Sequence, residues 1–268
     1  MKTPVFQRIF GDRPHTVIGM IHVRALPATP QHSGGMDPIL EQALAEAEVY
    51  RSCGIHALMI ENMHDIPYVQ NPGPEITAAM SVLAHAVKQA VPSLPLGIQI
   101  LAGGNRQALS AALSAGADFI RAEAFVFGHV ADEGYMDSCA GDLLRFRKAI
   151  GAEDIAVFTD IKKKHSAHAV TADVDIVQTA HAAEYFLSDG LILTGASTGE
   201  SASAKELQAV HSSTRLPVLV GSGITPDNLV DYLPFADAFI VGSAFKQDGH
   251  WANALDSDRI RRLVEVLS

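Results

Sequence analysis

The stretch LPVLVGSGITPDNLVDYLPFADAFIVGS (residues 216–243) carries the pattern that decides the fold. It begins with the apolar run LPVLVGS (216–222), continues through the helical pattern TPDNLVDYL, and ends in a second apolar run, ADAFIVGS (236–243). Thr225 followed by Pro226 is a typical helix start, a capping residue and then a proline in the first turn. A strand, a helix and a strand in such quick succession predict a βαβ unit with parallel strands.

The same alternation extends over the rest of the chain. Ala- and Leu-rich amphipathic segments separate the apolar runs, and one of them is expected to start after Asn105 and to stop at Gly116. Eight strands and eight helices in alternation predict an α/β fold, a (β/α)8 TIM barrel with a parallel eight-stranded sheet. Because no linker-like composition shift divides the chain, residues 1–268 are expected to form a single TIM-barrel domain. The six further candidate strands are TVIGMIH (16–22), IHALMIE (55–61), PLGIQI (95–100), ADFIRAEA (117–124), DIAVFTDI (154–161) and GLILTG (190–195).

Composition narrows the class of protein and of partner. Hydrophobic residues make up 48% of the 268, enough for a large core and too many for a disordered chain. Lys and Arg total 20 against 30 Asp and Glu, without a basic block, so no nucleic-acid partner is expected. The start of the chain lacks a signal-peptide core, no apolar run is long enough for a membrane span, and the two cysteines lie far apart. These features predict a cytoplasmic protein without a disulfide framework.

The connections between the predicted elements are unequal in length. Helix-to-strand connections are stubs such as SCG and AGA, whereas strand-to-helix connections include VRALPATPQHSGGM, NMHDIPYVQNPG and FVFGHVADEGYM. In a parallel barrel all strand-to-helix loops lie at one end, and TIM-barrel enzymes have their active sites at that end. The chemistry is therefore expected at the C-terminal ends of the strands.

The last three predicted strands each end in glycine beside a small hydroxyl residue, in LTGASTGE (193–200), VGSGITPDN (220–228) and VGSAFKQDG (241–249). Glycine lets backbone N–H groups approach an anion closely, and the loops after the last two strands form the usual phosphate site of such barrels. The alternative is that these glycines only make tight turns. The predicted phosphate-binding residues are Gly195, Thr198, Gly221, Ser222, Gly223, Gly242 and Ser243.

Ionisable residues gather at the same strand ends. Alternation along a strand puts Arg121 and Glu123 on one face, and it puts Asp160, Lys162 and Lys164 on one face if that strand continues so far. Glu123 and Asp160 are candidate general bases or hard-cation ligands, with Arg121 as their partner or as an electrophile toward substrate oxygens; the alternative is a buried salt-bridge network. The predicted catalytic residues are His22, Glu61, Arg121, Glu123, Asp160, Lys164 and His165, with Asn62 and Gln99 as candidate orienting amides.

Several common motifs are missing from the sequence. There is no GxGxxG after a first strand, no P-loop, no GxSxG elbow and no HExxH. A dinucleotide cofactor is therefore not expected, whereas a divalent cation held by Glu123 and Asp160 remains open. Trp251 and the terminal helix are expected only to close the barrel.

Several of these segments, taken in order, resemble the BtpA/SgcQ family. The resemblance rests on VIGMIHVRALPATP, ADFIRAEAF with GHVADEG, LLRFRKAIGAEDIAVFTDIKKKHSAH, LTGASTGE, PVLVGSGITPDNL and IVGSAFKQDG, and it runs from about residue 16 to the end. It implies a TIM barrel of the ribulose-phosphate-binding kind. The family pattern also highlights Pro27, Asn62, Thr194 and Gly199, whereas Lys163 and the PATP loop depart from it. The family is named for a cyanobacterial member linked to photosystem I biogenesis, and some similar proteins occur beside carbohydrate-utilisation genes.

Three functions follow as hypotheses. The first is an enzyme that performs isomerase, epimerase or lyase chemistry on a small phosphorylated, sugar-like metabolite. In this hypothesis Asp160 and Glu123 trade protons or bind a cation, and Lys164 with His165 stabilises developing oxyanion charge. The second is a non-catalytic assembly or stability factor of the photosystem I biogenesis type, and the third is a metal-dependent nucleotide hydrolase. A homo-oligomer is compatible with all three.

Overall fold

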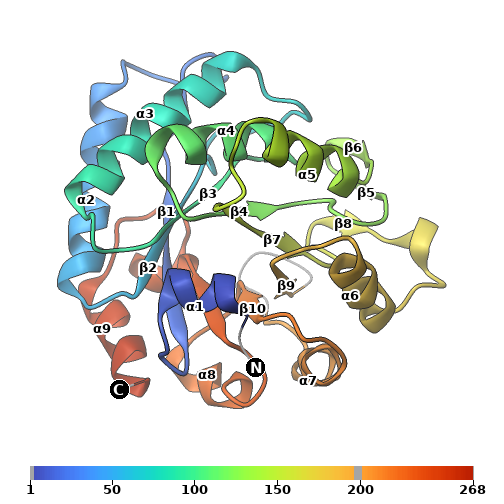
Figure 1. Cartoon of the computed structure of the whole chain (residues 1–268). Coiled ribbons are helices and arrows are strands. Elements are labelled where there is room, and N and C mark those ends of the chain that lie inside the picture. The colour runs from blue at the N-terminus through green and yellow to red at the C-terminus, as the bar shows by residue number, and fades with distance from the viewer. Residues whose placement is uncertain (1–2, 196–200, 268) are drawn as a thin grey trace.

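The computed structural model describes residues 3–195 and 201–267. Eight parallel strands form a closed barrel, so the predicted (β/α)8 fold is confirmed (Figure 1). The strands are β1 (Thr16–His22), β2 (Ala57–Glu61), β3 (Leu96–Gln99), β4 (Phe119–Ala122), β7 (Ala156–Asp160), β9 (Gly190–Thr194), β10 (Val218–Gly221) and β11 (Ala238–Val241). Each pairs with its neighbours in the order β1-β11-β10-β9-β7-β4-β3-β2, which returns to β1. Their side chains are almost entirely buried, as expected for strands covered by helices outside and packed side chains inside.

All eight predicted helices are present and surround the barrel (Figure 1). They are α2 (Asp37–Ser52), α3 (Pro74–Ala90), α4 (Asn105–Ala115), α5 (Ala140–Ala149), α6 (Ile176–Tyr185), α7 (Ala204–Ser213), α8 (Pro226–Tyr232) and α9 (Ser257–Val266). Three short 3-10 turns, η1 (Ala169–Thr171), η2 (Ser243–Phe245) and η3 (Gln247–Gly249), lie in the loops after β7 and β11. The buried helix faces are rich in alanine, which lets the helices pack closely on the sheet.

The helix ends agree with the sequence signals except at Asn105. Thr225 caps α8 with Pro226 in its first turn, and Gly116 ends α4 in the left-handed conformation with φ 71°. The sequence predicts that Asn105 precedes α4, but Asn105 is the first helical residue and Gly104 is the cap. Its side chain instead exchanges two hydrogen bonds with the backbone of Glu123, at 2.7 and 3.1 Å. Asn105 therefore anchors the segment that follows β4 rather than the helix.

An N-terminal helix that the sequence reasoning missed, α1 (Pro4–Phe10), covers the N-terminal end of the barrel (Figure 1). Phe6 and Phe10 are buried and pack against Phe119 and Phe158, with ring centroids 5.5 Å apart for Phe10 and Phe119. Gly97 leaves the space for the Phe119 ring, because a Cβ there would lie 2.1 Å from it. Aromatic side chains thus fill this end of the barrel.

The long connection after β4 folds into a hairpin. Its strands β5 (His129–Ala131) and β6 (Gly134–Met136) pair in antiparallel fashion, and β8 (Ser166–Ala167) from the loop after β7 joins them. This small sheet ties together two loops that both carry predicted site residues. Across the described parts of the chain, no helix has the length and apolarity to cross a membrane.

Candidate active site

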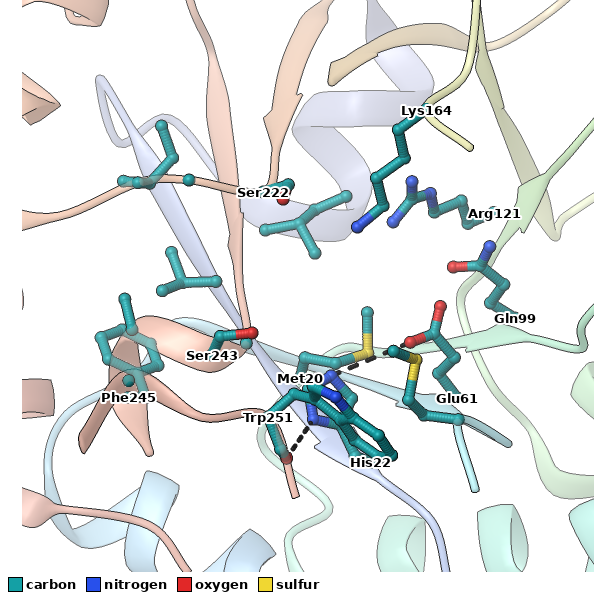
Figure 2. A pocket seen from close by; sticks show the side chains of 18 of the residues that line it. Met20, His22, Glu61, Gln99, Arg121, Lys164, Ser222, Ser243, Phe245 and Trp251 are labelled. Carbon is teal, nitrogen blue, oxygen red and sulfur yellow. Dashed lines mark hydrogen bonds and ion pairs between the residues drawn. The ribbon is translucent and has the colours of Figure 1, made fainter. Parts of the chain in front are cut away.

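The C-terminal end of the barrel contains a cavity of about 840 Å³. Side chains from β1, β2, β3, β4 and β7 line it, together with the loops after β7, β10 and β11 and the turn of the β5–β6 hairpin. Figure 2 shows ten of the lining residues by name, among them His22, Gln99 and Lys164, around one space. A cavity of this size matches the range of small-molecule sites, and it lies at the end where barrel enzymes place their chemistry.

The floor of the cavity is a row of polar side chains from adjacent strand ends. Strand register places His22 beside Glu61, and Glu61 beside Gln99. Arg121 follows on β4, the next strand. All four residues are buried and line the cavity. Polar residues that are far apart in the sequence thus form one continuous polar surface.

Arg121 and Asp160 form a buried, bidentate ion pair. The Arg121 Nε donates to one carboxylate oxygen at 3.0 Å, and Nη2 donates to the other at 2.9 Å. Burial raises the pKa of Asp160, while the neighbouring Arg121 charge opposes that shift. Both carboxylate oxygens are occupied, so the pair holds the Arg121 guanidinium in one orientation at the cavity wall.

Glu123 lies just beyond β4 and is held by three groups. It accepts hydrogen bonds from the Gly103 amide at 2.7 Å and from Gln99 at 3.5 Å, and it forms an ion pair with Lys163 at 3.2 Å. The sequence places Glu123 on the same face as Arg121, and both do line the cavity. Its ion-pair partner, however, is Lys163, a residue that the sequence analysis does not single out for a role.

His22 is held as a neutral ring in one tautomer. Its Nδ1 lies 3.0 Å from the backbone carbonyl of Trp251, which can only accept, so Nδ1 carries the proton. Burial lowers the pKa of His22 to about 3, and the Lys246 charge adds to that shift. Its Nε2 then carries a lone pair and lies 3.8 Å from Glu61, whose own pKa is raised by burial. Two groups of shifted pKa thus face each other in the cavity.

The lysine-rich loop after β7 departs from the predicted alternation. The strand ends at Asp160, and Lys162 adopts a left-handed conformation with φ 47° that directs its ammonium to the Thr171 carbonyl at 3.3 Å. The shared face of Asp160, Lys162 and Lys164 was expected only if the strand continued so far, and because β7 ends at Asp160 this condition is not met. Lys163 and Lys164 line the cavity instead.

Lys164 and His165 stand at different depths of this wall. Burial lowers the pKa of Lys164, and the nearby Arg121 charge acts in the same direction. Figure 2 shows the Lys164 ammonium reaching into the cavity. His165 is exposed at the rim, where partial burial and the charges of Lys164 and Lys163 lower its pKa. A lysine with a lowered pKa is a candidate base or nucleophile.

The predicted glycine loops lie on the opposite side of the same cavity. Ser222, Gly223, Gly242 and Ser243 line it, and Ser222 and Gly223 adopt left-handed φ values of 79° and 67°. A Cβ on Gly242 would lie 3.0 Å from the His22 ring, so this glycine also allows the loop to pack against His22. The loops after β10 and β11 therefore face the ionisable row, as the sequence predicts.

The other predicted phosphate residues are placed differently. Gly221 is the buried last residue of β10, and Gly195 follows β9, where the Thr194 hydroxyl accepts a hydrogen bond from the Lys164 amide at 3.1 Å. Thr198 and Gly199 lie outside the described residues. At the start of α8, the Thr225 amide donates to the Asn228 side chain at 2.8 Å, which leaves this amide occupied within the helix.

Sequence reasoning missed Trp251 as a site residue. The expectation that Trp251 only closes the barrel is too narrow, because its carbonyl holds His22 and its ring lines the cavity. The ring packs edge-on against His64, with centroids 4.7 Å apart. Only the tertiary structure brings this segment back over β1, so no local sequence signal marks it. Within the described ranges, no group of three His, Cys, Asp or Glu side chains is arranged to hold a metal ion.

The profile of the BtpA family matches residues 13–268. The chain belongs to the BtpA family. A relative from Caenorhabditis elegans is 47% identical over 266 residues, covering 97% of this chain and 96% of that protein, whose name describes it as mitochondrial. The photosystem I biogenesis protein BtpA of Synechocystis is 30% identical, covering 98% of this chain and 91% of that protein. The cytoplasmic location stays a prediction for this family member.

Solved structures similar to this BtpA-family chain are barrel enzymes. A (S)-3-O-geranylgeranylglyceryl phosphate synthase from Thermoplasma acidophilum, in complex with sn-glycerol-1-phosphate, has a TM-score of 0.60 at 17% identity and covers 100% of this chain and 98% of that chain. A thiamine phosphate pyrophosphorylase from Pyrococcus furiosus has a TM-score of 0.58 at 14% identity, covering 95% of this chain and 96% of that chain. At such identities these likenesses show the TIM-barrel fold alone.

Proposed function

We propose that this protein is an enzyme that acts on a small phosphorylated metabolite by proton-transfer or carbon–carbon bond chemistry. The observation that carries the proposal is that one cavity joins the two glycine loops to the row of ionisable side chains. A phosphate needs backbone amides, and proton transfer needs groups with shifted pKa values close to it. In this chain the glycine loops and the ionisable side chains line the same cavity at the C-terminal end of the barrel.

The phosphate subsite of this proposal is formed by Ser222 and Gly223 on one loop and by Gly242 and Ser243 on the other. The left-handed backbone at Ser222 and Gly223 turns the chain sharply at the end of β10, and such turns present N–H groups to an anion. The Ser222 amide donates to the Ile240 carbonyl at 3.4 Å, so the Gly223 amide is the backbone donor of this loop in the proposal. The similar Thermoplasma synthase was solved with a phosphate ester, sn-glycerol-1-phosphate, as its bound substrate. That likeness in fold agrees with a phosphorylated ligand for this chain.

The chemical roles follow from charge and hydrogen bonding. Lys164 and the Asp160-held Arg121 provide positive charge for an oxyanion that develops on the substrate. Glu61, with its pKa raised by burial, exchanges a proton with the substrate, and neutral His22 beside it accepts one. Glu123 and Asp160 act in this proposal as positioning residues, because Lys163 and Arg121 already occupy them.

The phosphate subsite is tested by binding of inorganic phosphate and phosphorylated sugars, measured by calorimetry and by the shift in Tm. Ser243→Asp places a carboxylate against the anion and should weaken binding at least tenfold. Ser243→Ala is the matched control, since it keeps the backbone amide and should bind within about threefold of the natural protein. Equal binding by both variants would remove the phosphate subsite from the proposal.

The proton-transfer step is tested by incubating phosphorylated aldoses and ketoses with the protein in D2O. Exchange of a carbon-bound hydrogen, or the appearance of an isomer or a cleavage product, is followed by NMR. We expect turnover in the natural protein and its loss in Lys164→Met and Glu61→Gln, with phosphate binding retained. Turnover that persists unchanged in both variants would contradict the assigned roles.

A non-catalytic assembly role is the second candidate, and one surface feature favours it. The name of the Synechocystis relative concerns photosystem I biogenesis. In this chain, the last residue of α6, Tyr185, and the two residues after it are apolar and exposed, with Tyr185 82% and Leu187 71% exposed. A role of this kind should fail in Leu187→Asp and survive in Lys164→Met. Sedimentation of the natural protein and of Leu187→Asp also tests whether this surface joins two copies of the chain.

A further inference from the structure

Three hydrogen-bond acceptors stand side by side along one wall of the cavity. His22, Glu61 and Gln99 end the adjacent strands β1, β2 and β3, in register. The Gln99 side chain is buried, its Nε2 points to Glu123, and its Oε1 has no hydrogen-bond partner among the described residues. Figure 2 shows this oxygen on the side of the cavity. A buried acceptor without a partner is costly unless a ligand or a water supplies a donor.

His22 joins this wall as an acceptor and not as a donor. The Nδ1–H of His22 donates a hydrogen bond to the Trp251 carbonyl at 3.0 Å. The unprotonated Nε2 is therefore the ring nitrogen on the Glu61 side. Glu61 adds a carboxyl group between the two neutral residues, with its closer oxygen 3.8 Å from His22. A molecule that lies along this wall must therefore bring hydrogen-bond donors.

The facing wall is built from donors. The Nε and Nη2 atoms of Arg121 donate hydrogen bonds to Asp160. Its Nη1 lies toward Gly221 and has no hydrogen-bond acceptor within residues 3–195 and 201–267. Lys164 reaches the same part of the cavity, close enough for Arg121 to influence its charge. A molecule that touches this wall must bring an oxygen with lone pairs, such as a carbonyl, an enolate or a carboxylate.

We infer that the cavity recognises a phosphorylated α-hydroxycarbonyl compound, with its free hydroxyl group at the wall of His22, Glu61 and Gln99, where it donates to the Gln99 Oε1, and with its carbonyl oxygen on Arg121 and Lys164. This inference rests on the proposed function and narrows its substrate class. A hydroxyl next to a carbonyl offers a donor and an acceptor on adjacent carbon atoms, which is the pairing that the two walls require. A phosphorylated carboxylic acid or simple ketone satisfies only the donor wall.

Three ligands that differ by one group test this substrate class. Dihydroxyacetone phosphate carries the hydroxyl and the carbonyl, hydroxyacetone phosphate lacks the free hydroxyl, and glycerol 3-phosphate has the carbonyl reduced. Their affinities are measured by calorimetry beside that of inorganic phosphate. We expect dihydroxyacetone phosphate to bind at least tenfold more tightly than hydroxyacetone phosphate, because the latter leaves the buried Gln99 oxygen unpaired. Glycerol 3-phosphate should also bind more weakly, since its hydroxyl oxygen is a weaker acceptor for the two cations than a carbonyl oxygen.

Gln99→Met locates the hydroxyl contact. It keeps the length of the side chain and removes the acceptor, so the preference for dihydroxyacetone phosphate over hydroxyacetone phosphate should fall to within threefold. Gln107→Met is the matched control, because Gln107 donates to the Pro72 carbonyl outside the cavity, and it should keep the full preference. Inorganic phosphate should bind alike to all three proteins, which shows that the fold and the phosphate subsite are intact.

The two proposals fail in different ways. If inorganic phosphate and all three phosphorylated ligands fail to bind the natural protein, the phosphate subsite is wrong, and the substrate class is wrong with it. If phosphate binds but dihydroxyacetone phosphate and hydroxyacetone phosphate bind equally, the phosphate subsite stands and the α-hydroxycarbonyl assignment is overturned. The assignment is also overturned if Gln99→Met keeps a tenfold preference.

Discussion

The two ends of the barrel are built from different kinds of side chain, although the same eight strands run through both. Aromatic rings close the N-terminal end, whereas polar and charged groups surround a cavity at the C-terminal end. At the N-terminal end, Phe6 and Phe10 of α1 pack with Phe119 and Phe158 into an aromatic layer. At the C-terminal end, strands β1 to β3 end in His22, Glu61 and Gln99, and β4 carries Arg121 next to its last residue, around an open cavity. The first end gains stability from apolar burial, whereas the second keeps charged groups from water at a cost in free energy. Stability and chemistry are thus separated along the barrel axis.

The largest expected effect is at the charged end. Arg121→Met leaves the Asp160 carboxylate buried without a partner, which should lower the free energy of unfolding by about 3–5 kcal/mol and abolish ligand binding. Urea unfolding and calorimetry measure the two effects. The double variant Arg121→Met with Asp160→Leu removes both charges and should regain most of the stability without regaining binding. A stable single variant would show that the pair is not desolvated.

The aromatic end should respond in stability alone. Phe6→Ala removes a fully buried ring from the layer and should lower the free energy of unfolding by about 3 kcal/mol, with unchanged ligand affinity. Phe186→Ala is the matched control, because that ring is 48% exposed and should change the stability by less than about 1 kcal/mol. Weaker ligand binding in Phe6→Ala would mean that the two ends are coupled.

Each end of the barrel also holds a histidine whose pKa is lowered. The effect of these two rings on the pH dependence of stability can be compared. Burial lowers the pKa of His22 to about 3 and that of His56 to about 4, so both stay neutral in the folded chain. The unfolded chain takes up these protons near pH 6.5, so stability should fall as the pH drops below 6.5. The slope is at most about 1.4 kcal/mol per pH unit for each ring.

His22→Asn and His56→Asn should each remove a similar part of that slope, because both rings stay neutral in the folded chain down to pH 5. Unfolding free energies at pH 7 and pH 5 measure the part that each ring contributes. Only His22→Asn should alter ligand affinity, because His56 accepts a hydrogen bond from the Val17 amide at the other end of the barrel. A pH slope unchanged by His22→Asn would contradict a neutral buried ring.

The smallest expected effect concerns Trp251. Trp251→Phe keeps the backbone carbonyl that holds His22, so the free energy of unfolding should change by less than about 1 kcal/mol. Because Trp251 is the single tryptophan of the chain, its fluorescence reports on the cavity directly. Dihydroxyacetone phosphate should change the emission of the natural protein, and Phe6→Ala should leave that response intact. Emission that is indifferent to ligand would place the binding site away from Trp251.

Local patterns explain why most of the barrel could be predicted. Apolar runs such as those ending at His22 and Gly221 alternate with amphipathic helices, and this alternation depends only on neighbours in sequence. The helix α1 could have been found from Thr3 and Pro4, which form a capping residue and a first turn. It escaped because one short helix before the first strand has no counterpart in the repeating pattern.

The residues of the site could be predicted from the sequence, but not all of their ion-pair partners. Seven side chains were expected from their position at strand ends, and those of β1, β2, β4 and β7 do reach one cavity. The sequence predicted Arg121 as a partner of Asp160, and this pair is present, but it did not predict that Glu123 pairs with Lys163 from the loop after β7. Alternation also failed at Lys162, where a left-handed backbone breaks the strand period.

The sequence by itself determined the barrel, the end of the barrel that carries the polar groups, and the family, because periodicity, turn residues and motif order are local properties of the chain. The tertiary structure decided which charges are neutralised, which tautomer His22 adopts and that Gln99 presents an unpaired acceptor. These depend on contacts between residues far apart in the chain, such as Trp251 over His22. Barrel closure fixes such distances, and no local pattern encodes them.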